Sequence, residues 1–502
     1  MNTTITPRAP GFFRFTVLFV LCCILLFSCQ YTYKIHATPH DALILVDGQP
    51  VVPEDENTSN SNSITITASH RDYTPIETTA VLHDPFATNV ISIDLVKKKY
   101  AMVIDCAPRE YQISIDHGTA AAPPIHASLE HGAHSVTLVS GGKEVYSEAI
   151  EVTAAKRKVI YHPQSSYGTR FPFIDENKIR FLGSFPTGKQ PKQVVFSPDS
   201  EYLYIPLLAD EGFDVYHMPS LTYLKKIPAG ASPSYLGFVE GLFLEHTNTF
   251  LVTQMTRSRI IEYSVQNPAE PVFSREINSK GNMPKVVAYS KKLDCIAVSN
   301  WMENSVVILD YATGNIKHVI PNLSVPRGVL FSPDERYLYI ASYEGGFTVK
   351  FETASWKEVN RVSVPKTAMR HIVQTKNGKT LFVSDMMFSK IFEIDATSFS
   401  LSHTYSVFSL PNTIDLTPND ELLFVSCRGP NSPEGYLYPS VYPGKVLAID
   451  VASRKIIGAI EGGRQPTGLD VSSDGKLLVF SNFQDADIDV YNIESLYSST
   501  EK

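Results

Sequence analysis

The chain from Ile179 onward repeats one pattern of hydrophobic and polar positions. In each unit an alternating strand leads through a polar turn into a nearly continuous apolar strand, such as Leu338-Tyr-Ile-Ala-Ser. A third and a fourth strand follow, as in Ser305-Val-Val-Ile-Leu-Asp and Asn315-Ile-Lys-His-Val-Ile. Four strands in roughly 40–45 residues is the period of a β-propeller blade, whose small sheets bury their faces against their neighbours.

Seven similar segments mark the first strand of each unit. They begin at Pro191, Pro233, Pro284, Pro326, Met369, Pro411 and Pro466, so that four of the six spacings are nearly equal and two are longer. The last unit has only three strands, and an unpaired strand, 179–185, precedes the first segment. Pairing these two ends would remove a free sheet edge. The sequence therefore predicts an all-β fold with a seven-bladed β-propeller over 179–495, closed in the Velcro manner, and a C-terminal tail at 496–502.

Two shorter stretches of alternating residues precede the repeats. Residues 30–99 and 100–165 each combine short strands with turn residues, which is typical of small antiparallel β-modules. In the second stretch, strands are expected at Tyr111-Gln-Ile-Ser-Ile-Asp, Glu144-Val-Tyr-Ser-Glu-Ala-Ile-Glu-Val and Lys158-Val-Ile-Tyr. We predict two small β-sandwich-like modules, followed by a linker at 166–178.

Both parts resemble known families. The turn and strand in Leu129-Glu-His-Gly-Ala-His-Ser-Val-Thr-Leu-Val, after the loop Ala121-Ala-Pro-Pro, are similar to PEGA domains, and 30–99 is similar to a more divergent copy. Ser332-Pro-Asp-Glu-Arg-Tyr-Leu-Tyr-Ile-Ala-Ser and Ser473-Asp-Gly-Lys-Leu-Leu-Val-Phe-Ser-Asn resemble the repeat of the YVTN (YncE-like) propellers. The resemblance implies the fold strongly and the function weakly. For the PEGA-like modules it implies a spacer or a surface-binding role.

The first 28 residues have the features of a signal peptide. Arg8 and Arg14 precede an apolar run that ends at Phe27, and this run is shorter than the roughly 20 residues needed to span a bilayer. Leu26-Phe27-Ser28-Cys29 resembles a bacterial lipobox, although Phe27 stands where a small residue is usual. We expect an exported, membrane-anchored lipoprotein of the cell envelope, lipidated at Cys29. The alternative is that Cys29 is an ordinary thiol beside a conventional cleavage site.

Charge and cysteine content exclude several classes of protein. The formal net charge is −8, and removing the two arginines of the signal peptide makes it −10. This balance opposes wholesale nucleic-acid binding. Cys106, Cys295 and Cys427 lie far apart, so neither a disulfide framework nor a metal site is implied, and no haem-attachment motif is present.

The strongest candidate site is a ring of residues that directly follow the seven segment starts. In a propeller these positions lie on one face, around the channel mouth, and here they are Lys192, Ser234, Lys285, Arg327, Arg370, Asn412 and Thr467. The neighbouring position and the ends of the second strands add His371, Arg428, Trp301, Tyr343, Glu344, Asp385 and Phe483. A cationic mouth with aromatic walls would suit an anionic ligand. The alternative is that these cations are only part of the repeat pattern, with their stems packed on the next blade.

Catalytic motifs are not found. The chain has no Gly-x-Ser-x-Gly elbow, no Walker loop and no His-Glu-x-x-His motif, so we predict a binding protein without a cofactor. Recurring acids are interpreted as turn formers: Asp199, Asp334, Asn419 and Asp474 after first strands, and Asp310, Asp395 and Asp450 after third strands. Resemblance to other propellers leaves open a metal-dependent lactonase-like or a quinone-dependent enzyme, and a single-stranded nucleic-acid binder. The expected partners are the membrane, and an envelope protein, peptidoglycan or another anionic ligand.

Overall fold

The computed structural model describes residues 30–106, 111–153, 158–161, 171–175, 177–230, 236–432, 434–440 and 442–496. Cys29 and the expected signal peptide lie outside these residues. The chain divides into two compact units, one formed by Met1–Tyr100 with Leu129–Gly132 and the other by Ala101–Ser128 with Ala133–Lys502. The prediction of an all-β protein is confirmed, because the described residues form strands and three short 3-10 turns, η1 (Glu245–Thr247), η2 (Met255–Arg257) and η3 (Glu494–Leu496). None of the helices in the described residues is long and apolar enough to cross a membrane.

The first unit contains two sheets with a shared apolar core. One sheet has the order β4-β1-β7, formed by Asn57–Ser59, Tyr31–Thr38 and Asn89–Asp94, and the other has the order β3-β2-β5-β6, formed by Gln49–Val51, Leu43–Val46, Ser63–His70 and Tyr73–Val81. Alternate residues of β1 and β5, such as Ile35 and Ile66, are buried in this core. The strict period of two is what places one face of each strand inside.

The next part of the chain also forms two sheets, each with three strands. Their orders are β10-β8-β13, from Ile125–Glu130, Lys99–Cys106 and Lys158–Tyr161, and β12-β11-β9, from Lys143–Val152, Gly132–Ser140 and Gln112–Ile115. The strands expected around 111–116, 144–152 and 158–161 are therefore present.

Seven four-stranded antiparallel sheets occupy the described residues from Arg180 to Asn492, which we call the repeat region. Their first two strands are β15 (Val195–Phe196) and β16 (Tyr202–Pro206), β19 (Phe238–Leu244) and β20 (Thr249–Gln254), β23 (Pro284–Ser290) and β24 (Cys295–Asn300), β27 (Pro326–Phe331) and β28 (Tyr337–Ser342), β31 (Met369–Gln374) and β32 (Thr380–Asp385), β35 (Pro411–Leu416) and β36 (Leu422–Cys427), and β39 (Pro466–Val471) and β40 (Leu477–Asn482). Their outer strands are β17 (Phe213–His217) and β18 (Thr222–Ile227), β21 (Arg259–Ser264) and β22 (Val272–Asn278), β25 (Ser305–Asp310) and β26 (Ile316–Ile320), β29 (Phe347–Glu352) and β30 (Lys357–Ser363), β33 (Lys390–Asp395) and β34 (Ser400–Ser406), β37 (Lys445–Asp450) and β38 (Lys455–Glu461), and β41 (Asp487–Asn492) and β14 (Arg180–Pro186).

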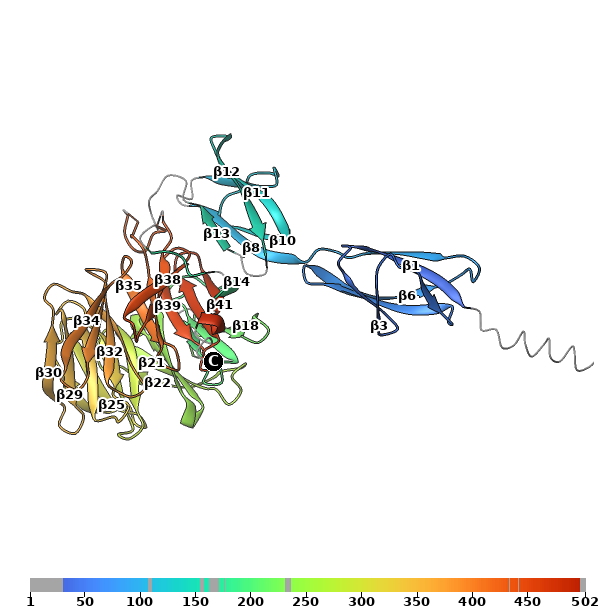
Figure 1. Cartoon of the computed structure of the whole chain (residues 1–502). Helices are drawn as coiled ribbons and strands as arrows, with labels where there is room; N and C mark the ends of the chain where they lie inside the picture. Colours follow the sequence, from blue (N-terminus) through green and yellow to red (C-terminus); the bar gives the residue numbers. More distant parts are fainter. Residues whose placement is uncertain are drawn as a thin grey trace, which may run out of the picture. The chain divides into compact units, whose positions relative to one another are not determined.

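The two ends of the repeat region share one sheet. β14, at its start, pairs antiparallel with β41, at its end, and the two strands lie side by side in Figure 1 although the whole repeat region separates them in sequence. Most first strands of successive sheets contact one another, including β15 with β39, and β19 contacts β16 of the preceding sheet. Apolar clusters fill the spaces between the sheets. This arrangement is consistent with a propeller-like fold.

In several sheets, a side-chain hydroxyl of the second strand forms hydrogen bonds with both its own sheet and the next one. Ser299 Oγ accepts a hydrogen bond from Val286 N (3.0 Å), in its own sheet, and donates one to Arg327 O (2.9 Å), in the following sheet. The same pair of bonds is made by Thr253 with Glu240 and Lys285, by Ser384 with His371 and Asn412, and by Ser426 with Thr413 and Thr467. The first strand bulges at this point in these sheets. We call this pair of bonds the hydroxyl bridge. It satisfies two backbone groups that the sheet ladders leave unpaired.

The recurring acids form turns, as the sequence predicts. Asp334 Oδ1 accepts bonds from Ser332 Oγ (2.7 Å) and Arg336 N (3.1 Å), and Asp199, Asn419 and Asp474 make equivalent bonds. Asp310, Asp395 and Asp450 accept backbone N–H groups of the turns after their strands. Short polar side chains favour turns because they can bond their own backbone.

The first strand of the second sheet begins later than its predicted start. Pro233 and Ser234 lie outside the described residues, and β19 begins at Phe238, which pairs with Gln254 as Pro284 pairs with Asn300. The residue that corresponds to Lys285 is therefore Val239 instead of Ser234. A proline marks the predicted start of most of the other strands but not the actual start of this one.

Part of the expected linker at 166–178 is joined to the repeat region. Phe173 bridges Ala459 of β38 in parallel, and the pairing continues through Ile174 N to Ala459 O (3.0 Å) and Ala459 N to Pro172 O (2.9 Å). Residues 171–175 thus cover the outer edge of the sheet that ends with β38, which protects that edge from other chains.

Removing one hydroxyl bridge should destabilise the repeat region. We expect Ser299→Ala to lower the free energy of unfolding by about 1–3 kcal/mol, because it leaves Val286 N and Arg327 O buried without partners. Chemical denaturation measures this difference. Ser400→Ala, at an exposed position of β34, is the matched control and should change it by less than about 0.5 kcal/mol. Equal effects of the two substitutions would contradict a role of the bridge in stability.

Candidate functional site

A cavity of about 260 Å³ opens where the first strands of the repeat region begin. Five cationic side chains line it, and they come from five different sheets: Lys192, Lys285, Arg327, Arg370 and Arg428. Its other lining residues are Leu208, Met255, Trp301, Tyr343, Met386, Leu410, Asn412, Asn431 and Tyr436. We call it the cationic cavity. It gathers charges that are widely separated in the sequence.

Backbone geometry makes these side chains converge. Lys285, Arg327 and Arg370 are the second residues of β23, β27 and β31, and each precedes the bulge in its first strand. The hydroxyl bridges hold the carbonyl groups of Lys285 and Arg327 at 2.8 and 2.9 Å from hydroxyls of the preceding sheets. The side chains therefore extend from fixed backbone positions toward one centre.

The five cations have no counter-ion. Among the described residues, none of them lies within 4 Å of a carboxylate oxygen. Glu240 on β19 is a nearby acid that acts on Arg370, Lys192 and Lys285 through space, without an ion pair. One carboxylate cannot balance five cations, and buried charges normally pair. The cavity therefore carries an uncompensated positive charge.

Aromatic rings form part of the wall. The guanidinium of Arg327 lies 4.3 Å from the ring centre of Trp301 and 4.6 Å from that of Tyr343. Lys285 Nζ lies 4.9 Å from the ring centre of Trp301 and 3.2 Å from Met255 Sδ. These contacts compensate the cations only in part, because a cation–π contact contributes about 0.5–2 kcal/mol and an isolated buried charge costs more.

Several polar atoms at the cavity have no hydrogen-bond partner among the residues that the structure describes. Both amide atoms of Asn412, Oδ1 and Nδ2, are buried without a hydrogen bond, and so are Nε of Arg327 and Nε of Arg428. Arg428 does bond Gln465 Oε1 and, at 3.4 Å, Tyr436 O. Buried polar atoms are almost always satisfied in folded proteins, so unpaired ones beside a cavity indicate a bound ligand or water.

Burial and mutual repulsion disfavour the charged forms of these groups. Burial, with the charges of Arg327 and Arg370, holds the pKa of Lys285 well below its usual value. Burial, together with Arg370, Lys285 and Arg428, does the same to the pKa of Lys192. Burial lowers the pKa of Arg327 and of Arg428 to about 10, so both arginines stay charged at neutral pH.

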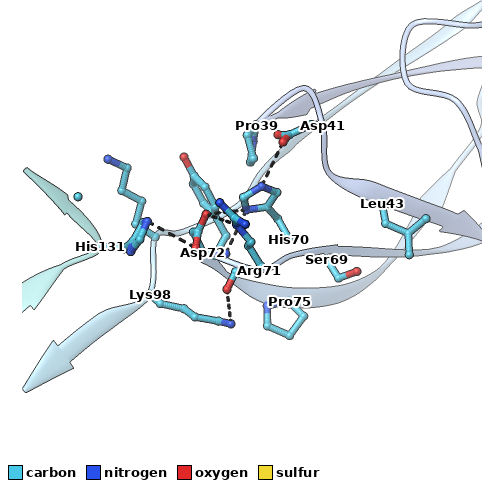
Figure 2. A pocket seen from close by; sticks show the side chains of 13 residues that line it. Pro39, Asp41, Leu43, Ser69, His70, Arg71, Asp72, Pro75, Lys98 and His131 are labelled. Carbon is cyan, nitrogen blue, oxygen red and sulfur yellow. Dashed lines mark hydrogen bonds and ion pairs between the residues drawn. The ribbon is translucent and has the colours of Figure 1, made fainter. Parts of the chain in front are cut away.

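A second pocket, in the first unit, has a different electrostatic character (Figure 2). It measures about 1110 Å³, and its two acids, Asp41 and Asp72, face basic side chains. His70 Nε2 lies 3.3 Å from Asp41 Oδ2, His131 Nε2 lies 3.4 Å from Asp72 Oδ1, and Arg71 Nε lies 3.2 Å from Asp72 Oδ2. Carboxylates offset part of the positive charge in this pocket, whereas none pairs with the cations that line the cationic cavity among the described residues. We therefore take the cationic cavity as the candidate site.

Two chemistries other than anion binding have less structural basis. Within the residues that the structure describes, no group of three or more His, Cys, Asp or Glu side chains is placed to hold a metal ion. Cys106, Cys295 and Cys427 are buried, and burial raises the pKa of the Cys295 thiol to about 11. A thiol with a raised pKa is a poor nucleophile at neutral pH.

Comparison with known proteins identifies a relative of this chain. No protein-family model matches it. Antigen Lp49 of Leptospira interrogans is 35% identical to it over 375 residues, which make up 71% of this chain and 81% of Antigen Lp49. The chain belongs to the Antigen Lp49 family.

Eight of the fourteen predicted mouth residues line the cavity of this Lp49-family chain. They are Lys192, Lys285, Arg327, Arg370, Asn412, Arg428, Trp301 and Tyr343. His371 lies beside Arg370 but does not line the cavity, and its Nδ1 faces Ile414 N at 3.5 Å. Burial lowers the pKa of His371 to about 3, so this histidine is neutral at physiological pH.

Asp385 has a structural part in the Lp49-family chain. Its carboxylate is fully buried and accepts backbone N–H groups from Ala368 (2.6 Å), Met387 (3.1 Å) and Phe388 (3.1 Å). These bonds fix the turn after β32, which carries Met386 into the cavity wall. Glu344, from the equivalent turn of another sheet, is exposed and does not line the cavity.

Sequence reasoning missed Glu240 and Tyr436 in the Lp49-family chain. Glu240 lies near the start of β19, which the sequence analysis placed too early in the chain. Phe238 pairs with Gln254, so counting back from the apolar strand Phe250-Leu-Val-Thr-Gln254 could have located Glu240. Tyr436 comes from the long insertion between β36 and β37, which explains the wide spacing between the last two segments but has no repeat counterpart. Tyr436 places its ring centre 5.5 Å from the guanidinium of Arg428.

The Lp49-family chain should gain stability when a cavity lysine is replaced by an apolar side chain. An unfolded lysine keeps its proton up to about pH 10.4, whereas buried Lys285 gives it up at lower pH. Between these two pKa values the unfolded state binds more protons than the folded state. The free energy of unfolding, measured without added anions, should therefore rise with pH above neutrality, by up to about 1.4 kcal/mol per pH unit for each such lysine. We expect Lys285→Met to raise the melting temperature at pH 7 and to flatten its increase between pH 7 and pH 9.

Thermal unfolding in a chloride-poor buffer measures both quantities. Lys189→Met, at an exposed lysine, is the control and should keep the wild-type slope. If Lys285→Met destabilised the protein and kept that slope, Lys285 would not be a strained buried cation.

Proposed function

We propose that this protein is a cell-envelope lipoprotein that binds an anionic ligand in the cationic cavity of a closed, seven-bladed YVTN-type (YncE-like) β-propeller. The proposal treats the seven four-stranded sheets as blades and the pairing of β14 with β41 as the closure. Contacts between first strands of successive sheets support this interpretation.

The uncompensated charge of the cavity carries the functional part of the proposal. Five buried cations, with one nearby carboxylate that forms no ion pair with them, and the unpaired amide of Asn412 destabilise the protein without a ligand. An anion would pair the cations and could accept the free N–H groups of Asn412, Arg327 and Arg428. Charge-assisted hydrogen bonds of this kind are roughly twice as strong as neutral ones. The repeat pattern alone would not explain polar groups that remain unpaired.

The location rests on the sequence and on the relative. A lipid on Cys29 would lie next to the first sandwich, because only Gln30 separates Cys29 from β1. The two PEGA-like modules would then act as a spacer between the membrane and the repeat region. The relative is named as an antigen, which supports a location in the envelope or at the cell surface.

Anion binding should stabilise the wild-type protein against heat. We expect inorganic phosphate, single-stranded DNA or a muropeptide to raise the melting temperature, since a ligand at 100 times its dissociation constant adds about 2.7 kcal/mol. A Lys285→Gln, Arg370→Gln double variant should lose the shift, because it removes two of the five cations. A thermal-shift series with each compound at matched ionic strength measures this.

Each outcome of this series has a distinct meaning. Lys189→Gln is the control and should keep the shift. A response to DNA alone, with a steep salt dependence, would favour the nucleic-acid alternative. No shift with any anion, or an equal shift in the double variant, would refute anion binding at this site.

A further inference from the structure

Exposed apolar side chains surround the cationic cavity. Most of them belong to turns that also supply its wall, and Leu236 accepts a hydrogen bond from Thr256, next to the wall residue Met255. We call them the apolar rim: Leu236, Met302, Met387, Phe388, Leu437 and Tyr438. Their exposed fractions lie between 49% and 63%. Contiguous exposed apolar side chains next to a polar site commonly mark an interaction surface.

Adjacent residues of the same turn face opposite environments. After β24, Trp301 lines the cavity, and the next residue, Met302, is 61% exposed. After β32, Met386 lines the cavity, and Met387 is 63% exposed. The wall residues form an inner layer and the rim residues an outer layer. Since the two turns come from different sheets, this arrangement occurs at more than one side of the cavity.

The rim differs from the remaining apolar surface of the repeat region. In the described part of that region, the other large apolar side chains that are exposed and do not line the cavity lie on fourth strands: Tyr223, Leu224, Val272, Phe273, Ile316, Val319, Val359, Leu401 and Ile457. Such strands are the outer edges of their sheets, where scattered apolar exposure is ordinary. The rim residues differ from these because they lie next to the uncompensated positive charge of the cationic cavity.

The size of the cavity limits what it can enclose. Pockets that bury a whole drug-sized ligand measure about 300–1,000 Å³, and this cavity measures about 260 Å³. It therefore accepts one charged group, and the rest of the ligand must lie outside, on the rim. A ligand with an anionic tip and apolar shoulders would match both layers.

Charges on the same turns disfavour a membrane surface as the ligand. Glu303 directly follows Met302, Glu344 follows Tyr343, and Glu434 lies in the loop that carries Tyr436. Glu303 and Glu344 are exposed. These acids would repel a planar anionic bilayer beside the cavity, while the segments before β23 and β31 carry the exposed cations Lys280 and Lys366. A folded partner can insert one acid deeply and place cations opposite the outer glutamates.

We propose that the cationic cavity and the apolar rim together form a protein-binding surface, which receives one Asp or Glu side chain of a partner while flanking apolar residues pack on Met302, Met387 and Phe388. The proposal rests on the anion-binding function of the cavity. Aromatic residues, Met and Arg are enriched at protein interfaces, and hot spots lie at their desolvated centres. The partner segment is expected to carry Lys or Arg further out.

Selection from a phage-displayed library of randomised, disulfide-closed peptides tests the surface. On the purified protein we expect enrichment of peptides with an Asp or Glu flanked by apolar residues. Enriched peptides should bind a rim variant, Met302→Ser with Met387→Ser and Phe388→Ser, about tenfold more weakly. The matched control, Val272→Ser with Ile316→Ser and Val359→Ser on fourth strands, should bind like the wild type.

The outcomes separate this proposal from anion binding itself. If phosphate still stabilises the rim variant but the peptides bind it as well as the wild type, the protein-binding surface is refuted and the anion site stands. If no acidic, apolar-flanked peptide is enriched while phosphate binds, the surface is refuted in the same way. If neither phosphate nor peptides bind, both proposals fail. Rim-dependent sedimentation with phosphatidylglycerol vesicles, without peptide enrichment, would replace the protein partner with a membrane.

Discussion

The hydroxyl bridge between neighbouring sheets is the interaction on which the repeat region and its site depend. One hydroxyl, such as that of Ser299, pairs the bulged first strand of its own sheet with the first strand of the next. The residue whose carbonyl is held in this way, here Arg327, extends its side chain into the cationic cavity. The Ser or Thr of the repeat pattern therefore has a double effect in four of the sheets. It joins the sheet to the next one, and it holds the backbone of the cavity residues Lys285, Arg327 and Asn412. Ala341 occupies this position in the fourth sheet, where the bridge to Arg370 cannot form.

The buried cations of the cavity lower the stability of the protein, and the proposed anion binding gives a reason for this cost. Apolar side chains at the ring positions would pack without an electrostatic cost, and one sheet has such a residue, Val239. Lys192 and Lys285 instead have lowered pKa values because of burial and repulsion. Residues kept at a cost in stability are the ones for which a functional reason should be sought. A bound anion removes the repulsion, so ligand binding and the protonation of these lysines are linked.

The repeat made much of this architecture predictable, and departures from the repeat hid the rest. Strand positions, the turn acids and most of the mouth residues follow from the spacing of similar segments. Glu240 was missed because β19 begins without a proline, and Tyr436 because an insertion has no counterpart to align. The part played by Asp385 depends on three backbone N–H groups that only folding brings together. Residues 171–175 look like a linker in the sequence, because so short a segment shows no periodic alternation of apolar and polar residues. Their pairing with β38 is visible only in the structure.

Proton uptake on anion binding tests the central claim most directly. Titration calorimetry with inorganic phosphate at pH 8, in buffers of different ionisation enthalpy, gives the number of protons bound with the anion. We predict that the wild-type protein takes up protons, because phosphate favours the charged forms of Lys192 and Lys285, whose pKa values burial and repulsion lower, and that a Lys192→Met, Lys285→Met variant takes up fewer. Phosphate binding with equal proton uptake in both proteins, or no phosphate binding at all, would contradict a cavity of buried cations that awaits its counter-ion.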